Sequence, residues 1–195
     1  MIQSLQLTRQ QQNAISTICE WVGNKLPLIA LAGPAGSGKT TTIKALVKEL
    51  KKFGNVQVCA TTNKAARVLC LKGIDAITMH QACMRPLFRP PLDKLANFLA
   101  YAESVDDNFK ISKPSSLLDQ YSEDQLNTAL DTTRRVGVCS ALRQLGIQDI
   151  FSYLEGWLPA PEQDGILIID EASMLGDLDL ATVQNVFKVV ILVGD

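Results

Sequence analysis

Apolar residues follow two different spacings along the chain, and the two spacings predict different elements. Residues 8–23 place Ile15, Ile18, Cys19 and Val22 at helical spacing, and Thr8 is suited to cap that helix. Short unbroken apolar runs bounded by polar residues predict buried strands. The expected helices are 8–23, 40–52 and 64–71, and the expected strands are 28–31, 56–60, 77–78, 166–169 and 189–193. Strands that alternate with helices predict an α/β fold, in which helices cover both faces of a parallel sheet.

The interval 84–164 interrupts this alternation. It opens with three prolines, continues through an acidic, loop-rich middle around 106–116, and regains a helical pattern only at 149–158. We interpret 84–164 as an insertion or small subdomain, carried by a domain that residues 1–83 and 165–195 form. Residue 195 directly follows an expected strand, and a sheet covered on both faces rarely stops there, so we also expect a truncated C-terminus.

Composition limits the function classes only broadly. The 195 residues are 47% hydrophobic and 20% charged, with a net charge of −1, which is typical of a soluble globular protein. No apolar run approaches the length of a membrane span and the N-terminus has no signal-peptide pattern, so a cytoplasmic protein is expected. The five cysteines lack zinc-site spacing and are interpreted as reduced thiols that fill core space.

Charge is uneven along the chain, although it nearly cancels overall. Residues 61–92 hold five Lys or Arg residues and one acidic residue, whereas 103–131 hold seven acidic and two basic residues. The basic stretch could follow a nucleic-acid backbone, and the acidic stretch would repel one. Because a basic stretch is also common on an ordinary solvated face, this pattern only supports a nucleic-acid site that other residues indicate.

The segment GPAGSGKT, at residues 33–40, has the phosphate-loop pattern GxxxxGK[ST] between an expected strand and an expected helix. Gly36 and Gly38 allow the backbone to turn its N–H groups toward phosphate oxygens. The start of the following helix adds partial positive charge. Lys39 supplies a charge for the β- and γ-phosphates, and Thr40 supplies a hydroxyl for Mg²⁺. The expected nucleotide-binding residues of this segment are Gly33, Pro34, Ala35, Gly36, Ser37, Gly38, Lys39, Thr40 and Thr41.

The expected strand 166–169 ends in two carboxylates, Asp170 and Glu171. Asp170 is expected to reach Mg²⁺, usually through a water molecule. Glu171 can polarise a second water molecule toward the γ-phosphate, which suits hydrolysis better than transfer of the phosphoryl group to a metabolite. Lys39 and Glu171 are therefore the expected catalytic residues, and Thr40 and Asp170 the expected metal ligands.

Besides the phosphate loop, five short segments stand out in order along the chain: LTRQQ at 7–11, ATTNKAA at 60–66, TMH at 78–80, DEASM at 170–174 and VGD at 193–195. In this order they resemble motifs of the superfamily 1 DNA helicases, in their RecD-like and Dda-like branch. They are similar to the motif that precedes the phosphate loop, motif Ia, a short motif that follows it, motif II, and the first half of motif III. The resemblance implies the N-terminal RecA-like ATPase domain of such a helicase, which uses ATP and Mg²⁺ and moves on single-stranded DNA. The interval 84–164 has no counterpart.

The resemblance also assigns roles outside the phosphate loop. Gln11 would hydrogen-bond the adenine edge, for which its amide has a donor and an acceptor, although Gln10 or Gln12 could take that place. The residues that would contact single-stranded DNA are Thr61, Thr62, Asn63, Lys64 and His80. Structural roles stay open for these residues, because the first four also suit the capped turn between a strand and a helix.

A complete helicase of this kind has a second RecA-like domain that supplies an arginine to the ATP site, and these 195 residues do not contain that domain. Since such an arginine is worth several orders of magnitude in rate, we expect the chain to bind Mg²⁺-ATP, to hydrolyse it poorly and not to unwind DNA. The expected 5′-to-3′ polarity rests on the resemblance alone. Two other classes stay open: an AAA-type replication or recombination loader, and an interaction module that uses ATP as a switch. The adjacent Asp170 and Glu171 disfavour the switch.

Overall fold

The computed structural model describes residues 7–89, 92–103 and 120–195. It divides into two compact units: residues 1–85 with 159–195, here the sheet unit, and residues 86–158, here the helical unit. None of the helices in the described ranges combines the length and the apolar character that crossing a membrane requires.

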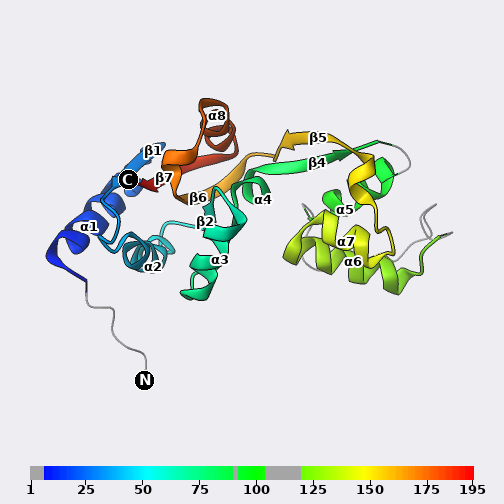
Figure 1. The fold of residues 1–195 in the computed structure, drawn as a ribbon, viewed down its shortest axis with the longest axis horizontal. Coiled ribbons are helices and arrows are strands. Elements are labelled where there is room, and N and C mark those ends of the chain that lie inside the picture. The colour runs from blue at the N-terminus through cyan, green and yellow to red at the C-terminus, as the bar shows by residue number, and fades with distance from the viewer. Residues whose placement is uncertain (1–6, 90–91, 104–119) are drawn as a thin grey trace, which may run out of the picture. The chain divides into compact units, whose positions relative to one another are not determined.

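The sheet unit is built on five parallel strands (Figure 1). Their order is β1-β7-β6-β2-β3, and their bounds are Leu28–Ala32 for β1, Val56–Ala60 for β2, Ala76–Thr78 for β3, Gln163–Asp170 for β6 and Phe187–Gly194 for β7. Each adjacent pair is parallel. All five strands fall where apolar runs predicted them, so the α/β fold class is confirmed.

Helices cover both faces of this sheet. The helices of the sheet unit are α1 (Arg9–Gly23), α2 (Lys39–Leu50), α3 (Asn63–Leu71), α4 (Met79–Cys83) and α8 (Asp177–Val186), and a 3₁₀ turn, η2, spans Ala172–Met174. On β6, Ile166 and Ile168 pack with α1, α2 and α3, whereas Leu167 and Ile169 pack with α4 and α8. A strand buried on both faces must be apolar at every position, which explains why β6 reads as an unbroken hydrophobic run.

The helical unit has a core of its own. It contains α5 (Leu92–Glu103), α6 (Glu123–Val136), α7 (Val138–Gln144) and the 3₁₀ turn η1 (Ile150–Tyr153). Strands β4 (Met84–Phe88) and β5 (Leu154–Pro159) form a two-stranded sheet that carries the chain between the units. Leu99, Leu126, Leu142 and Ile150 are fully buried in this second core.

One expectation for the interval 84–164 is wrong, and the helices of this interval were not predicted. The pattern at 149–158 is not a helix but η1 followed by β5, because the segment pairs with β4. Helix α6, which no sequence pattern had indicated, includes part of the acidic stretch 103–131; Ser122 caps its N-terminus, and Glu123 and Asp124 lie in its first turn. Carboxylates there favour a helix because they interact with its N-terminal dipole. The loop predicted around 106–116 lies outside the described residues.

Candidate functional site

The phosphate-loop segment connects β1 to α2 along the edge of the sheet where the strands end. Gly36 and Gly38 have φ angles of 79° and 84°, a region in which glycine is unstrained. The N–H of Gly33 donates to the carbonyl of Gly194 at the end of the adjacent strand β7, at 3.1 Å. Gly38 occupies the N-cap of α2 and has no side chain with which to cap the helix. The positive φ angles agree with the turn that the glycines of the motif predict, and anion binding by the loop stays a prediction.

Lys39 folds back across this loop. Its ammonium group donates to the carbonyl of Gly33 at 2.6 Å and to that of Pro34 at 3.3 Å. It also contacts the carboxylate of Asp195, directly after β7. The Lys39 side chain is 15% exposed, so its charge lies largely inside the loop. Asp195 thereby supplies an anion to the lysine that is expected to bind phosphate.

The two carboxylates after the central strand differ in their surroundings. Asp170, the last residue of β6, is 9% exposed, and burial raises the pKa of its carboxyl group. A backbone hydrogen bond from Glu171 and the charges of Lys39 and Lys72 partly oppose that rise in pKa. Glu171 is exposed and has a φ angle of 56°, an uncommon backbone conformation for a residue with a side chain.

The donors near Asp170 fit magnesium better than a metal held by many protein ligands. No group of three or more His, Cys, Asp or Glu side chains gathers at one point within the described ranges. Mg²⁺ at phosphate sites takes one or two protein oxygens, and phosphates and water complete its six ligands. The hydroxyl of Thr40 and the carboxylate of Asp170 are chemically suited to supply the protein oxygens.

A second lysine reaches Thr40, and no sequence motif indicated it. The Nζ atom of Lys72, which follows α3, donates to the Oγ1 atom of Thr40 at 3.3 Å. Thirty-two positions separate the two residues in the chain, so only the tertiary fold brings them together.

Gln11 connects α1 to the phosphate loop. Its Oε1 atom accepts from the N–H of Thr8 at 2.9 Å, which completes a capping box at the start of α1. Its Nε2 atom donates to the carbonyl oxygens of Ser37 and Gly38, at 3.2 and 3.5 Å. The φ angle of 84° favours glycine at position 38, and a Cβ atom there would also displace the Gln11 amide. The adenine contact of Gln11 stays a prediction.

The residues expected to contact DNA gather after β2 and β3. These strands are neighbours, and Ala60 pairs with Thr78 at their ends. Thr62 caps α3 by accepting from the N–H of Ala65 at 3.2 Å. The hydroxyl of Thr61 lies 3.8 Å from the sulfur of Met174.

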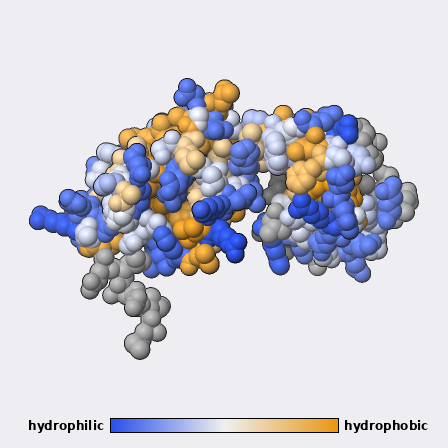
Figure 2. Space-filling view, viewed as in Figure 1, coloured by the Kyte–Doolittle hydropathy of each residue, from blue (hydrophilic) through white to orange (hydrophobic). Residues whose placement is uncertain are grey.

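The remaining three are on the surface: Asn63 and Lys64 are exposed in the first turn of α3, and His80 is exposed in α4. Apolar side chains also reach the surface nearby, since Met174 is 66% exposed and Leu178 of α8 is 86% exposed. Figure 2 shows apolar residues on the face in view where α8 lies. Contact between this region and DNA stays a prediction.

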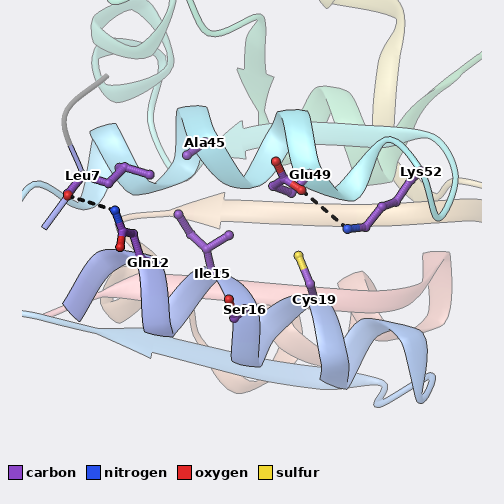
Figure 3. A pocket seen from close by; sticks show the side chains of 8 residues that line it. All are labelled: Leu7, Gln12, Ile15, Ser16, Cys19, Ala45, Glu49 and Lys52. Atoms are coloured by element: carbon purple, nitrogen blue, oxygen red, sulfur yellow. Dashed lines mark hydrogen bonds and ion pairs between the residues drawn. The ribbon is translucent and has the colours of Figure 1, made fainter. Parts of the chain in front are cut away.

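A groove of about 270 Å³ runs between α1 and α2 (Figure 3). Ile15 and Cys19 of α1 lie across it from Ala45 of α2, and the Glu49–Lys52 ion pair, at 3.5 Å, lies toward its far end. Its lining residues are Leu7, Gln12, Ile15, Ser16, Cys19, Ala45, Glu49 and Lys52. They include none from the phosphate loop, so this groove is separate from the predicted phosphate site.

A phosphate loop after one strand and paired carboxylates after a central parallel strand define a phosphate-loop ATPase domain. A family model described as "AAA domain" matches residues 6–195, and the chain belongs to this family. The match agrees with the motifs, and the chain is a RecA-like domain of the superfamily 1 helicase type.

Two curated proteins are similar to this chain. The "ATP-dependent DNA helicase dda" of Enterobacteria phage T4 is 34% identical over 77 residues, which are 38% of this chain and 18% of that protein. A "Nucleotide-binding protein" of Psychrobacter cryohalolentis is 24% identical over 150 residues, which are 76% of this chain and 45% of that protein. The chain thus spans less than half the length of these curated relatives.

One solved structure is described as "Structural Basis for DNA Unwinding at Forked dsDNA by two coordinating Pif1 helicases". The alignment covers 98% of the present chain and 34% of the chain in that structure, with a TM-score of 0.44 and 20% sequence identity.

Proposed function

We propose that the chain is the first motor domain of a DNA helicase, which couples hydrolysis of Mg²⁺-ATP to movement on single-stranded DNA and to duplex unwinding. The sheet unit is the motor domain, and the helical unit is an insertion within it. The observation that carries this proposal is the position of two groups on one sheet. Lys39 and its loop follow β1, and Asp170 and Glu171 follow β6, with only β7 between the two strands.

Each group has a distinct task in this mechanism. The loop amides and Lys39 bind the β- and γ-phosphates, and Asp195 leaves Lys39 when they arrive. Thr40 and Asp170 would hold Mg²⁺, which would neutralise charge on the phosphate oxygens when bound. Glu171 orients a water molecule and takes its proton as the water oxygen bonds to the γ-phosphorus; the bond from that phosphorus to the bridging oxygen breaks, and ADP and phosphate leave.

DNA would bind across the ends of β2 and β3. The hydroxyl, amide and ammonium groups of Thr61, Thr62, Asn63 and Lys64 suit phosphates without reading sequence, and exposed His80 lies after the neighbouring strand. Ala60 ends β2 and pairs with Asp170, which ends β6. The turn expected to contact DNA starts at the next residue, Thr61, and so lies beside the expected metal ligand. A displacement of the backbone at the metal site can therefore move the start of α3.

A second RecA-like domain would complete the ATP site with an arginine and would be needed for full turnover and for unwinding. The 195-residue chain alone is therefore expected to bind Mg²⁺-ATP, to turn it over slowly and to separate no duplex. Roles in DNA replication, repair or recombination in the cytoplasm are consistent with this activity.

ATP turnover with and without single-stranded DNA tests the proposal, measured on the chain alone and together with its second domain. A helicase predicts strong stimulation by single-stranded DNA and strand separation when both domains are present. A loader ATPase predicts turnover without strand separation, and a nucleotide switch predicts binding without turnover. Either of these results would exclude the helicase.

The Glu171→Gln variant tests the assigned base. It should keep nucleotide affinity within about twofold and lower turnover by about 10²- to 10⁴-fold, the usual contribution of a general base. Glu162→Gln is the matched control, because Glu162 is an exposed carboxylate of the same unit whose ion pair with Lys188 has a length of 3.5 Å. Loss of ATP affinity in Glu171→Gln would contradict the role given to this residue.

A further inference from the structure

Lys72 brings a second ammonium group to the proposed nucleotide site. Its Nζ atom donates to the Oγ1 atom of Thr40 at 3.3 Å, and Thr40 supplies the hydroxyl expected to bind Mg²⁺. The charge of Lys72 also acts on Asp170, the other expected metal ligand. The Lys72 side chain therefore contacts one of the two protein groups that the metal would use, and its charge acts on the other.

The turn that carries Lys72 is fixed to the helix after the phosphate loop. The Nζ atom of Lys44, on α2, donates to the carbonyl of Lys72 at 3.1 Å. The N–H of Lys72 bonds to the carbonyls of Val68 and Leu69, at 3.2 and 3.0 Å. Gly73 follows with a φ angle of 76°, and a Cβ atom there would come within 3.3 Å of Lys44 Nζ. Backbone and side-chain bonds thus hold the turn in place, while the long Lys72 side chain stays exposed and can move.

We propose that the ammonium group of Lys72, in contact with Thr40, supplies positive charge to the nucleotide site that Thr40 and Asp170 form, until Mg²⁺ takes its place. The inference rests on the proposed function, because it requires a nucleotide whose metal is held by these two residues. Without a cation, the Asp170 carboxylate and a triphosphate would repel each other in a site that is partly shielded from water.

Lys72 therefore matters most when metal is absent. Lysine is a compact charge on a flexible stem, so it can neutralise phosphate oxygens and withdraw when a divalent ion arrives. Metal-free nucleotide binding should depend strongly on Lys72, whereas binding with saturating Mg²⁺ should depend on it little. A residue that only stabilised the turn after α3 would change both affinities by the same factor.

The test measures the dissociation constant of the non-hydrolysable analogue AMP-PNP by isothermal titration calorimetry, in excess EDTA and in saturating Mg²⁺. For Lys72→Met, the ratio of the EDTA value to the Mg²⁺ value should rise at least about fivefold above that of the unmodified chain, since one full charge is lost close to the phosphates. Lys72→Arg keeps the charge and should restore most of the original ratio. Circular dichroism of each variant verifies that the helices are retained.

Lys48→Met is the matched control, because Lys48 is an exposed lysine on the same helix as Lys44. Its ratio should equal that of the unmodified chain. The proposal is overturned if Lys72→Met leaves the ratio unchanged, lowers both affinities equally, or matches Lys48→Met. If the unmodified chain binds no AMP-PNP in either condition, the proposed function fails and this inference fails with it. Normal binding with an unchanged ratio in Lys72→Met removes only the inference.

Discussion

The ammonium group of Lys39 contacts the carboxylate of Asp195, and the two residues follow strands that are neighbours in the sheet. Ala32 of β1 pairs with Gly194 of β7, so Asp195 lies beside the start of the phosphate loop, and Lys39 reaches it by folding back across that loop. An anion is thus already present at the lysine of the phosphate loop. Any nucleotide that uses Lys39 must displace this carboxylate.

Removal of that internal anion should strengthen nucleotide binding. We expect Asp195→Asn to bind Mg²⁺-ATP about two- to fivefold more tightly, since the carboxylate is 61% exposed and ion pairs of this kind contribute up to about 1 kcal/mol. Titration with a fluorescent ATP analogue measures the change. Asp164→Asn is the control, because it removes an exposed carboxylate paired with Lys188 instead. Equal or weaker binding in Asp195→Asn would show that nucleotide does not compete with this contact.

The two contacts of Gln11 can be separated by comparing two variants. Thr8→Ala removes the cap of α1 and should lower stability by about 1 kcal/mol while leaving nucleotide selectivity intact. Gln11→Ala should cost a similar stability and should also reduce the preference for ATP over GTP, because the side chain expected at the adenine edge is lost. Urea unfolding and competitive nucleotide titration measure the two effects. If Gln11→Ala left the preference for ATP over GTP unchanged, Gln11 would have only structural contacts, with the cap of α1 and with the phosphate loop.

The buried carboxylate of Asp170 should lower the stability of the fold at neutral pH while it serves as a metal ligand. Burial raises the pKa of its carboxyl group, so the folded state disfavours the ionised form, and its contribution to stability is lost as the pH rises through the folded pKa. Asp170→Asn should therefore have a higher melting temperature than the unmodified chain at pH 7. This difference should vanish at a pH below the ordinary aspartate pKa of about 3.9.

The same Asp170→Asn variant should lose most of the tightening of nucleotide binding that Mg²⁺ produces. Thermal unfolding at pH 7 and in acid, with AMP-PNP titrations with and without Mg²⁺, gives both measurements. A lower melting temperature at pH 7, or full retention of the magnesium effect, would argue against Asp170 as a buried metal ligand.

The cysteines should react with thiol reagents at very different rates. Burial raises the pKa of Cys83 to about 12 and raises the pKa of Cys59 as well, whereas Cys70 is exposed. At pH 8 the thiolate fraction of Cys83 is about 10³-fold below that of an ordinary cysteine, because each unit of pKa changes it tenfold. Cys70 should therefore react rapidly in the native protein, and Cys59 and Cys83 only after unfolding. Timed labelling with mass spectrometry assigns each site, and a Cys70→Ala variant that kept the rapid phase would disprove the assignment.

Local patterns predicted the sheet unit well. The capped helix α1, the strands and the phosphate loop each follow from short-range chemistry: a Thr8–Gln11 capping box, apolar runs, and glycines before Lys39. The helical unit was harder, because α6 was not predicted and β5 was interpreted as part of a helix. Their states depend on partners distant in sequence, as β5 pairs with β4 across more than sixty intervening positions.

Site residues were likewise predictable where a local motif contains them and not where only the fold brings them together. Lys39, Thr40 and Asp170 belong to motifs that a single segment displays, and the sequence was sufficient to select them. The Lys39–Asp195 and Lys72–Thr40 contacts depend on strand order and on how α2 packs against the turn after α3. Neither could be derived without the fold, because no local spacing relates the partners.

The chain leaves the sheet unit after Arg85 and rejoins it at Pro159. Close to both points, the N–H of Ala160 donates to the carbonyl of Cys83 at 2.8 Å. The excursion thus begins and ends almost at one point, and its own core contains no residue of the cores around the sheet. The entropy cost of closing a loop grows only slowly with its length, so the stability of the sheet should depend little on the length of the segment inserted there. Such a junction lets evolution, or a designer, shorten or exchange the excursion while the ATP machinery stays as it is.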